Sequence, residues 1–224
     1  MDTSVKKVKS GIMGLDALID GGFPEGSIVI VSGTPGTGKT IMGLQFINEG
    51  VKDKEMGIYV SFEQSRQDIM RQAAQFGWDF EALEKKNLLR IFTMWPSSFD
   101  EVMAKIFKCL YYKPKRLVVD SITSIAYTMR DNREAFHKMA EKLKETNLTA
   151  ILTSEILYGQ DGFSRDGISE FVGDGLIILK SVEAAGEHKN LLRIEKMRSC
   201  KINKESHIYD FGKGGMELTR TSSR

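Results

Sequence analysis

Gly33-Thr34-Pro35-Gly36-Thr37-Gly38-Lys39-Thr40 fits the phosphate-binding loop pattern Gly-x-x-x-x-Gly-Lys-Ser/Thr without a mismatch. The apolar run 27–31 before it predicts a buried strand, and residues 41–47 after it predict a helix, which is the context that such a loop requires. Glycines let backbone N–H groups turn toward an anion, and the helix N-terminus adds partial positive charge. The stretch predicts a nucleoside triphosphate site; the alternative is a glycine-rich turn that matches by chance.

Two side chains of this loop have separate expected roles. Lys39 can reach the β- and γ-phosphates, and the Thr40 hydroxyl can ligate Mg²⁺. The full set of expected nucleotide contacts is Gly33, Thr34, Pro35, Gly36, Thr37, Gly38, Lys39, Thr40 and Ile41.

A second acidic element should hold the metal ion at the tip of a neighbouring strand. The run 116–120 supplies it, because three apolar residues are followed by Asp120. This is the Walker B arrangement, and it predicts that Asp120 and Thr40 organise Mg²⁺. An aspartate that caps an ordinary turn is the alternative.

One further carboxylate ends a predicted strand. Glu63 follows the run 57–62, where its side chain could orient and deprotonate an attacking water. The alternative for this residue is a solvated acid at a strand end.

Short β-rich runs alternate with helical patterns along the chain, which predicts an α/β fold with a mostly parallel central sheet and helices on both faces. Capping patterns at 98–101 and 131–134 each open an amphipathic helix whose Met and Phe stripe belongs in the core. Near the end of the chain, 175–181, 191–197 and 207–211 predict consecutive antiparallel edge strands. The other expected strands are 57–62, 88–93, 116–121 and 149–155.

Length and composition limit the class of protein. With 224 residues, 41% of them hydrophobic, we expect residues 1–224 to form a single domain. We expect a cytoplasmic protein without membrane insertion, since the sequence has no long apolar run and no signal-peptide pattern. Cys109 and Cys200 suggest neither a disulfide framework nor a zinc site. The formal charge of +2 does not decide whether nucleic acid is a partner.

A series of ordered motifs over residues 10–211 resembles the KaiC-like ATPases of the RecA/RadA recombinase superfamily. The N-terminal signature 10–27 runs directly into the phosphate loop. The further matches are Val60-Ser61-Phe62-Glu63 for the catalytic-glutamate strand, Val119-Asp120-Ser121 for Walker B, Thr153-Ser154-Glu155 for the sensor strand, residues 170–174 for a late strand, and Glu195-Lys196-Met197-Arg198 for a Lys-x-Arg finger.

This resemblance implies a single-domain, archaeal, RecA-type P-loop ATPase that uses ATP and Mg²⁺. It also implies a homo-oligomer, a hexamer or a filament, with nucleotide between subunits and with Lys196 and Arg198 at the γ-phosphate of the neighbouring protomer. A strand projects these two residues to the same face, and cations supplied in trans can stabilise transition-state charge. Without the resemblance, solvated charges on an edge strand would be the preferred interpretation.

The sequence departs from the family at two places. Gln64 stands where the KaiC proteins carry a second glutamate, so hydrolysis is expected to differ in rate. The tail 219–224 does not match the segment that the clock proteins phosphorylate, and a circadian role is therefore not expected. Glu155, in contrast, agrees with KaiC rather than with the strand-exchange enzymes, which favours the KaiC-like branch.

Three biological roles fit the resemblance. The leading hypothesis is a recombinase paralogue with an accessory role in DNA repair or recombination. Its rivals are a nucleotide-dependent assembly scaffold, as the archaellum ATPase implies, and a clock-type autokinase.

Single-stranded DNA or a protein partner would meet the two loops that the superfamily turns toward the filament axis, here 127–133 and 157–170. Arg165 and Phe163 could contact phosphate and stack on bases, but Asp161, Asp166 and Glu170 oppose them.

Overall fold

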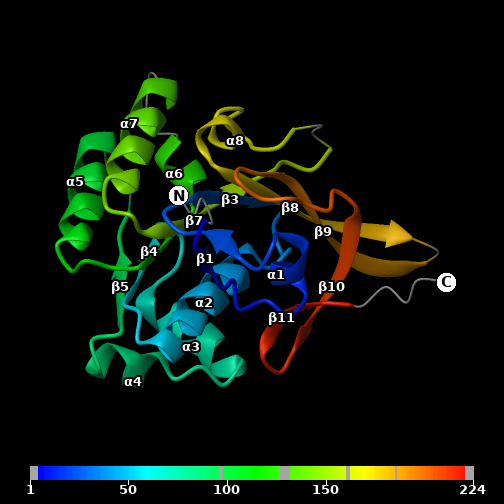
Figure 1. Ribbon diagram of the computed structural model, residues 1–224, viewed down its shortest axis with the longest axis horizontal. Coiled ribbons are helices and arrows are strands. Elements are labelled where there is room, and N and C mark those ends of the chain that lie inside the picture. The colour runs from blue at the N-terminus through cyan, green and yellow to red at the C-terminus, as the bar shows by residue number, and fades with distance from the viewer. Residues whose placement is uncertain (1–4, 96–97, 127–131, 160–161, 185, 220–224) are drawn as a thin grey trace.

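The computed structural model describes residues 5–95, 98–126, 132–159, 162–184 and 186–219. It confirms the predicted α/β class: a nine-stranded sheet lies between two layers of helices (Figure 1). The strands are β1 Lys7–Val8, β2 Phe23–Pro24, β3 Ile28–Gly33, β4 Gly57–Ser61, β5 Leu89–Thr93, β6 Arg116–Asp120, β7 Thr149–Glu155, β8 Gly175–Ala184, β9 Glu187–Met197, β10 Ser206–Gly212 and β11 Gly215–Leu218. The helices are α1 Leu15–Leu18, α2 Lys39–Gly50, α3 Arg66–Gln75, α4 Phe80–Lys85, α5 Phe99–Leu110, α6 Ile122–Ala126, α7 Asn132–Lys144 and α8 Ser169–Val172, with a 3₁₀ turn at Val51–Asp53.

Strand order in the main sheet is β11-β10-β9-β8-β3-β7-β6-β4-β5. The pairs from β8 to β5 are parallel, and β9, β10 and β11 add antiparallel strands at the other edge. The antiparallel prediction is confirmed for 191–197 and 207–211 but is wrong for 175–181, because β8 pairs parallel with β3 inside the sheet. The strand β9 begins earlier than expected and forms a long hairpin with β8, whereas β11 and the small β1–β2 sheet were not predicted. Because β3 lies between β7 and β8, the loop that follows it opens at the middle of the sheet.

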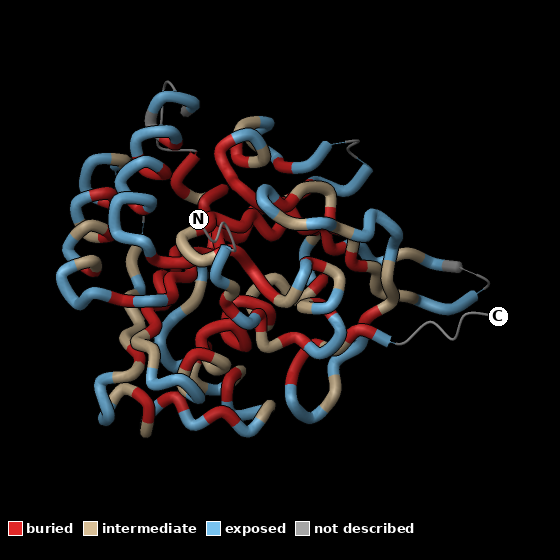
Figure 2. Tube along the Cα trace, viewed as in Figure 1, coloured by how far each residue is buried: buried red, intermediate tan, exposed pale blue. Residues whose placement is uncertain are grey.

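Alternation along the central strands divides the core into two clusters. In β3, Val29 and Val31 face the cluster that includes α2 and α3, while Ile28 and Ile30 face the cluster of α5 and α7. These central segments are buried throughout (Figure 2). The sheet is therefore covered on both faces, which explains why its strands are continuous hydrophobic runs.

The predicted helix stripes are confirmed where the structure describes them. Met103 and Ile106 of α5 and Phe136 and Met139 of α7 are buried in the second cluster. The Ser98 hydroxyl accepts the backbone N–H of Glu101, as its capping pattern predicts. The second capping pattern, at 131–134, starts on a residue outside the described ranges.

A buried arginine, Arg116, bonds the N-terminal segment of the chain to the core. Arg116 is 1% exposed, and its Nε donates to a Glu55 carboxylate oxygen at 2.6 Å. Its Nη1 donates to the carbonyls of Lys9 and Phe46 at 2.7 and 2.9 Å, and the guanidinium lies 4.6 Å from the Phe46 ring centre. A Cβ at Gly50 would come within 2.5 Å of Arg116 Nε, so only glycine leaves room for this cation.

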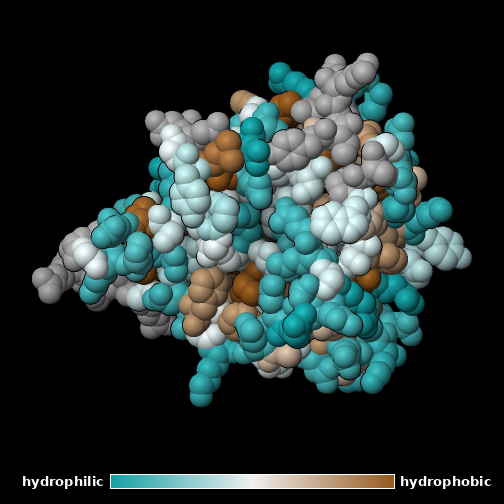
Figure 3. Space-filling view, turned by 180° about the vertical axis from the view of Figure 1, so that it is seen from behind, coloured by the Kyte–Doolittle hydropathy of each residue, from teal (hydrophilic) through white to brown (hydrophobic). Residues whose placement is uncertain are grey.

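The outer surface is mixed. On the face seen from behind, hydrophobic residues form small separate groups among hydrophilic ones (Figure 3).

Both cysteines carry free thiols, and burial raises the pKa of Cys109 to about 11. No helix in the described part of the chain is both long enough and apolar enough to cross a membrane.

Candidate functional site

The phosphate loop connects the carboxyl end of β3 to the first residue of α2. Gly36 and Gly38 have φ angles of 81° and 85°, in the left-handed region that favours glycine. A Cβ at Gly38 would lie 2.3 Å from Cζ of Phe211, so close packing also demands glycine there. The local sequence thus folds into the backbone cradle that its pattern predicts.

Lys39 lies across this loop. Its Nζ donates to the carbonyl oxygens of Gly33 at 2.9 Å and Thr34 at 3.1 Å. Burial lowers the pKa of the Lys39 ammonium, and the nearby negative charges of Asp120 and Glu155 oppose that shift. The two carbonyls hold the ammonium at the mouth of the loop, within reach of an anion bound there.

Asp120 is the meeting point of three elements. Its carboxylate is 3% exposed and accepts hydrogen bonds from Thr40 Oγ1 at 2.8 Å, Tyr59 Oη at 2.6 Å and Thr153 Oγ1 at 2.5 Å. Burial and the neighbouring Asp120 charge raise the pKa of the Tyr59 phenol well above its usual range, so Tyr59 remains the donor. The Thr40 and Asp120 oxygens form a hard donor set of the kind that Mg²⁺ prefers, so these residues fit the predicted metal.

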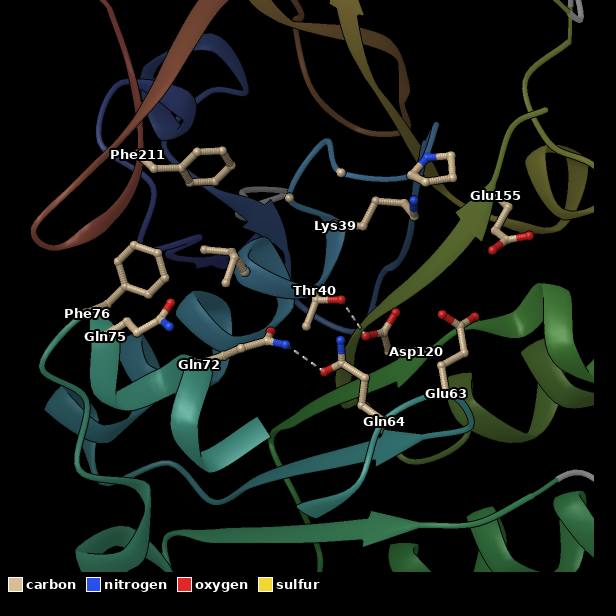
Figure 4. Close-up of a pocket in the computed structure, with 14 residues that line it drawn as sticks. Lys39, Thr40, Glu63, Gln64, Gln72, Gln75, Phe76, Asp120, Glu155 and Phe211 are labelled. Atoms are coloured by element: carbon tan, nitrogen blue, oxygen red, sulfur yellow. Dashed lines mark hydrogen bonds between the residues drawn. The ribbon is translucent and has the colours of Figure 1, made fainter. Parts of the chain in front are cut away.

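Glu63 and Glu155 face the same space as Asp120 and Lys39 (Figure 4). Glu63 follows β4, its side chain is exposed, and its Oε1 accepts the hydroxyls of Ser121 at 2.5 Å and Ser124 at 3.3 Å. These two donors fix the orientation of a carboxylate that stands beside the loop.

Gln64, the residue after Glu63, is turned toward a neighbouring helix. Its Oε1 accepts Nε2 of Gln72 on α3 at 3.1 Å, and its backbone N–H donates to Ser61 Oγ at 2.9 Å. An amide cannot take up a proton as a carboxylate can. Of these two neighbouring side chains, only that of Glu63 can accept a proton.

One cleft of about 570 Å³ connects these groups. Its charged end holds Lys39, Asp120, Glu63 and Glu155, and the aromatic rings of Phe76 and Phe211 stand at the other end (Figure 4). The lining residues are Pro35, Gly36, Gly38, Lys39, Thr40, Ile41, Glu63, Gln64, Gln72, Gln75, Phe76, Asp120, Glu155 and Phe211. A cleft with one charged and one aromatic end suits a ligand that joins an anionic chain to a flat ring.

The C-terminal strands hold the loop from the other side. Tyr209 of β10 is fully buried, and its Oη donates to the Thr37 carbonyl at 2.6 Å. Phe211, two residues later, packs edge-on against the Tyr209 ring with centroids 5.8 Å apart. The structure therefore adds β10 to the site, which the sequence did not predict.

The structure does not bring Lys196 and Arg198 to this cleft. Residue 196 pairs with Leu176 at the start of β8, whereas the phosphate loop follows Gly33, which pairs with Leu179 further along the same strand. Lys196 is near the end of β9, and Arg198 lies just beyond Met197, its last residue. Both residues therefore stand at the amino-terminal edge of β8 and β3, opposite the loop of their own chain.

The two segments proposed for nucleic-acid contact are only partly within the described residues. Residues 127–131 and 160–161 lie outside them. In the described part of the second segment, Phe163 is 41% exposed and Arg165 Nη1 lies 3.3 Å from a Glu155 carboxylate oxygen. Arg165, the one basic residue of 157–170, is thus paired with the acidic side chain of Glu155.

Sequence reasoning missed the hydroxyl donors to Asp120 and the aromatic end of the cleft. Tyr59 sits among apolar residues of β4, and Thr153 follows the apolar run 150–152 of β7; a polar tip beside such a run is the signal that could have drawn attention to them. Phe211 and Phe76 gave no comparable signal, because aromatic residues at those positions also suit ordinary packing.

The chain matches known proteins over nearly its whole length. The family described as "ATPase: KaiC" matches residues 8–223. The circadian clock oscillator protein KaiC of Prochlorococcus marinus subsp. pastoris is 35% identical over 245 aligned residues, covering 98% of this chain and 48% of that protein. The same protein of Parasynechococcus marenigrum is 34% identical, with 98% and 47% covered. The chain spans about half the length of the curated relatives it matches.

A solved structure shares the fold. The crystal structure of a KaiC-like protein from the hyperthermophilic archaeon Pyrococcus horikoshii OT3 superposes with a TM-score of 0.88 at 38% identity. The superposition covers 96% of this chain and 100% of that chain.

Tyr209→Phe should lower the free energy of unfolding by about 1 kcal/mol, because the buried Thr37 carbonyl loses its donor. Burial raises the pKa of the Tyr209 phenol far above its usual value, so the loss should not depend on pH near neutrality. Urea denaturation of both proteins measures the difference.

Tyr158→Phe is the matched control, since exposed Tyr158 donates to the Pro35 carbonyl of the same loop at 3.5 Å. It should change the free energy of unfolding by less than about 0.5 kcal/mol. Equal urea midpoints for the two variants would mean that the Tyr209 bond does not stabilise the loop.

Proposed function

The chain belongs to the KaiC ATPase family, and from this premise we propose that it binds ATP with Mg²⁺ in the cleft described above and hydrolyses it. The observation that carries the proposal is the single cleft that combines Lys39, the Thr40–Asp120 pair and Glu63. Phosphoryl transfer needs a cation on the phosphates, ligands for the metal ion and a group that positions water, and these residues supply all three.

The charged end of the cleft would bind the triphosphate. Backbone N–H groups of the loop and the first turn of α2 point positive charge at the phosphates. The Lys39 ammonium, now on two carbonyls, would exchange them for phosphate oxygens. Thr40 and Asp120 would hold Mg²⁺, which when bound supplies positive charge to the phosphates.

The aromatic end would hold the base. Phe211 and Phe76 flank the outer part of the cleft beside Ile41, where a flat ring can pack against an aromatic face. Gln72 and Gln75 add amide groups that can hydrogen-bond a heterocycle.

Glu63 is the proposed general base. A water near the γ-phosphate would lose its proton to the carboxylate as its oxygen attacks phosphorus, while the bond from that phosphorus to the bridging oxygen breaks and ADP leaves with the electron pair. The hydroxyls of Ser121 and Ser124 orient that carboxylate, and Gln64 cannot replace it.

We further propose that residues 1–224 act as one ATPase domain in a homo-oligomer, a ring or a filament, with Lys196 and Arg198 serving the nucleotide of the neighbouring subunit. Their position on the edge opposite their own loop supports this arrangement. A cation that reaches a transferring phosphoryl group in trans is a known way to complete such a site.

The biological role is a finer proposal. A protein-assembly scaffold is favoured over a role in DNA repair or recombination, because Arg165 is paired with Glu155 and acids surround it. A clock role is not proposed, since Gln64 and the tail depart from the clock pattern. Titration with single-stranded DNA at several salt concentrations, with and without ATP, separates the DNA role from the scaffold role.

Lys39→Ala should abolish ATP turnover and weaken ATP binding while the fold remains intact. The side chain contributes charge to the loop rather than packing to the core. Steady-state phosphate release and the ATP-dependent rise in melting temperature measure the two effects. Lys52→Ala, at an exposed lysine beyond α2, is the control and should behave as the parent does. Normal turnover by folded Lys39→Ala would refute the assignment of the loop.

Glu63→Gln should bind Mg-ATP but hydrolyse it about 10²- to 10⁴-fold more slowly, because an amide can hydrogen-bond water yet cannot accept its proton. Single-turnover phosphate release gives the rate, and Glu155→Gln is the matched variant from the same cleft. If Glu155→Gln were the slow enzyme and Glu63→Gln the normal one, Glu155 would be the base.

Arg198→Ala should lose turnover through the neighbouring subunit, since an arginine finger contributes about 10³- to 10⁵-fold. Mixing inactive Arg198→Ala with inactive Lys39→Ala should restore turnover, because an intact loop then meets an intact finger at some interfaces. Mass analysis establishes that the mixture co-assembles. Mixtures that co-assemble and stay inactive would mean that each subunit is catalytically self-contained.

A further inference from the structure

Asp174 lies just before β8, at the edge of the sheet opposite the phosphate loop. Its side chain is 13% exposed, and its carboxylate serves three donors. Oδ2 accepts the backbone N–H of Ile28 at 3.1 Å. Oδ1 accepts Lys144 Nζ at 2.8 Å and Arg198 Nη1 at 2.9 Å. The backbone adds bonds from Asp174 N to the Ile28 carbonyl and from Arg198 N to the Asp174 carbonyl.

The two carboxylate oxygens have different parts. Oδ2 fixes the first residue of β3, whereas Oδ1 is shared by two cations from distant segments, α7 and the end of β9. Burial alone would raise the pKa of the Asp174 carboxyl, but the bonds from Lys144, Ile28 and Arg198 hold it below its usual value. The carboxylate is therefore charged near neutrality and attracts both cations.

Lys196, the other predicted finger residue, is anchored on the same short segment. Its Nζ donates to the Gly173 carbonyl at 2.5 Å and lies 3.5 Å from the Glu170 carbonyl. Burial and the positive charge of Arg198 lower the pKa of the Lys196 ammonium, while Asp174 opposes the shift. Residues 170–174 thus form a platform that holds both cations of the Lys-x-Arg pattern.

The Arg198 guanidinium is held at one nitrogen and remains largely open. The Arg198 side chain is 56% exposed, in contrast to the 13% of its partner Asp174. A guanidinium has five N–H donors in a rigid plane, so one bond to Asp174 leaves others available for an incoming anion. One nitrogen of the group is fixed by Asp174, while more than half of the side chain is exposed to solvent.

We propose that Asp174 is the positioning residue of the arginine finger: it holds Arg198 in the orientation in which the free side of the guanidinium meets the nucleotide of a second copy of this chain. This inference rests on the proposed function in trans. A free arginine side chain samples many rotamers, and an anchored one has lost part of that freedom before the interface forms. Asp174 touches no reacting atom and acts only through Arg198.

A purely structural role is the alternative, since Asp174 also caps the start of β3. Asp174→Asn separates the two, because its amide oxygen can still accept the Ile28 N–H while the cations lose their negative partner. We expect Asp174→Asn to lower the urea midpoint, because Lys144 and Arg198 lose their charged partner, but to keep the ATP-dependent rise in melting temperature. Its turnover should fall about 10²-fold, the scale of a misplaced catalytic group.

Mixed assemblies provide the decisive readout. Asp174→Asn has an intact loop and a misplaced finger, so mixing it with Lys39→Ala should restore turnover at about a quarter of the interfaces in an equal, random assembly. Mixing it with Arg198→Ala should restore nothing, because neither chain then supplies an ordered finger. Asp100→Asn, at an exposed aspartate of α5, is the control and should keep the parental turnover alone.

Three outcomes of this experiment are distinct. Restored turnover with Lys39→Ala, and none with Arg198→Ala, supports the proposal. Suppose that Lys39→Ala regains turnover when mixed with Arg198→Ala but not when mixed with Asp174→Asn. Asp174 then acts on the loop of its own chain through β3, and the proposal is overturned. If Arg198→Ala also fails with Lys39→Ala in proven mixtures, the finger in trans is wrong and the role of Asp174 falls with it.

A second variant covers the case in which Asp174→Asn does not fold. Asp174→Glu keeps the negative charge and moves it by one methylene group, so the guanidinium is displaced while the cations stay paired. It should show the same pattern in mixtures, with restored turnover beside Lys39→Ala and none beside Arg198→Ala. Parental turnover by Asp174→Glu alone would show that turnover does not depend on where this carboxylate holds Arg198, and would overturn the proposal.

Discussion

The buried carboxylate of Asp120 is the interaction on which the rest of the cleft depends. A charged group in the interior is stable only when it is hydrogen-bonded, and hydroxyls from α2, β4 and β7 meet that need. The three hydrogen bonds to Asp120 therefore fix the distances of α2, β4 and β7 from β6, the strand that carries the aspartate. The same requirement leaves Thr40 and Asp120 oxygens side by side, where a hard cation suits both.

Strand direction determines at which edge of the sheet each functional residue lies. Parallel strands bring their carboxyl ends to one edge, so the loop after β3, the acid at the end of β6 and Glu63 after β4 gather there. The antiparallel strand β9 runs back to the other edge and takes Lys196 and Arg198 with it. An oligomer is then the simplest way in which both groups can meet one nucleotide, which is why assembly and chemistry are linked in the proposed function.

The sequence predicted most of the fold because its signals are local. Alternating strand and helix patterns, the capping serine before α5 and the apolar stripe of α7 each depend on residues close together in the chain. The prediction failed where pairing partners decide the structure. The small β1–β2 sheet and the strand β11 are short. The first is fixed by the pairing of its two strands, and the second by pairing with β10 and by the Gln45 side chain, which bonds both backbone groups of Met216.

What the sequence by itself determined is the phosphate loop, the α/β class and the acids at strand ends, since each needs only residue types at fixed spacing. Only the tertiary structure decided which hydroxyls surround Asp120, that Gln64 turns toward Gln72, and that Phe211 closes the far end of the cleft. It also decided that Arg198 shares the Asp174 carboxylate with Lys144. The physical reason is that these contacts join residues on different elements, and their distances follow from how strands order and helices pack, which no local pattern encodes.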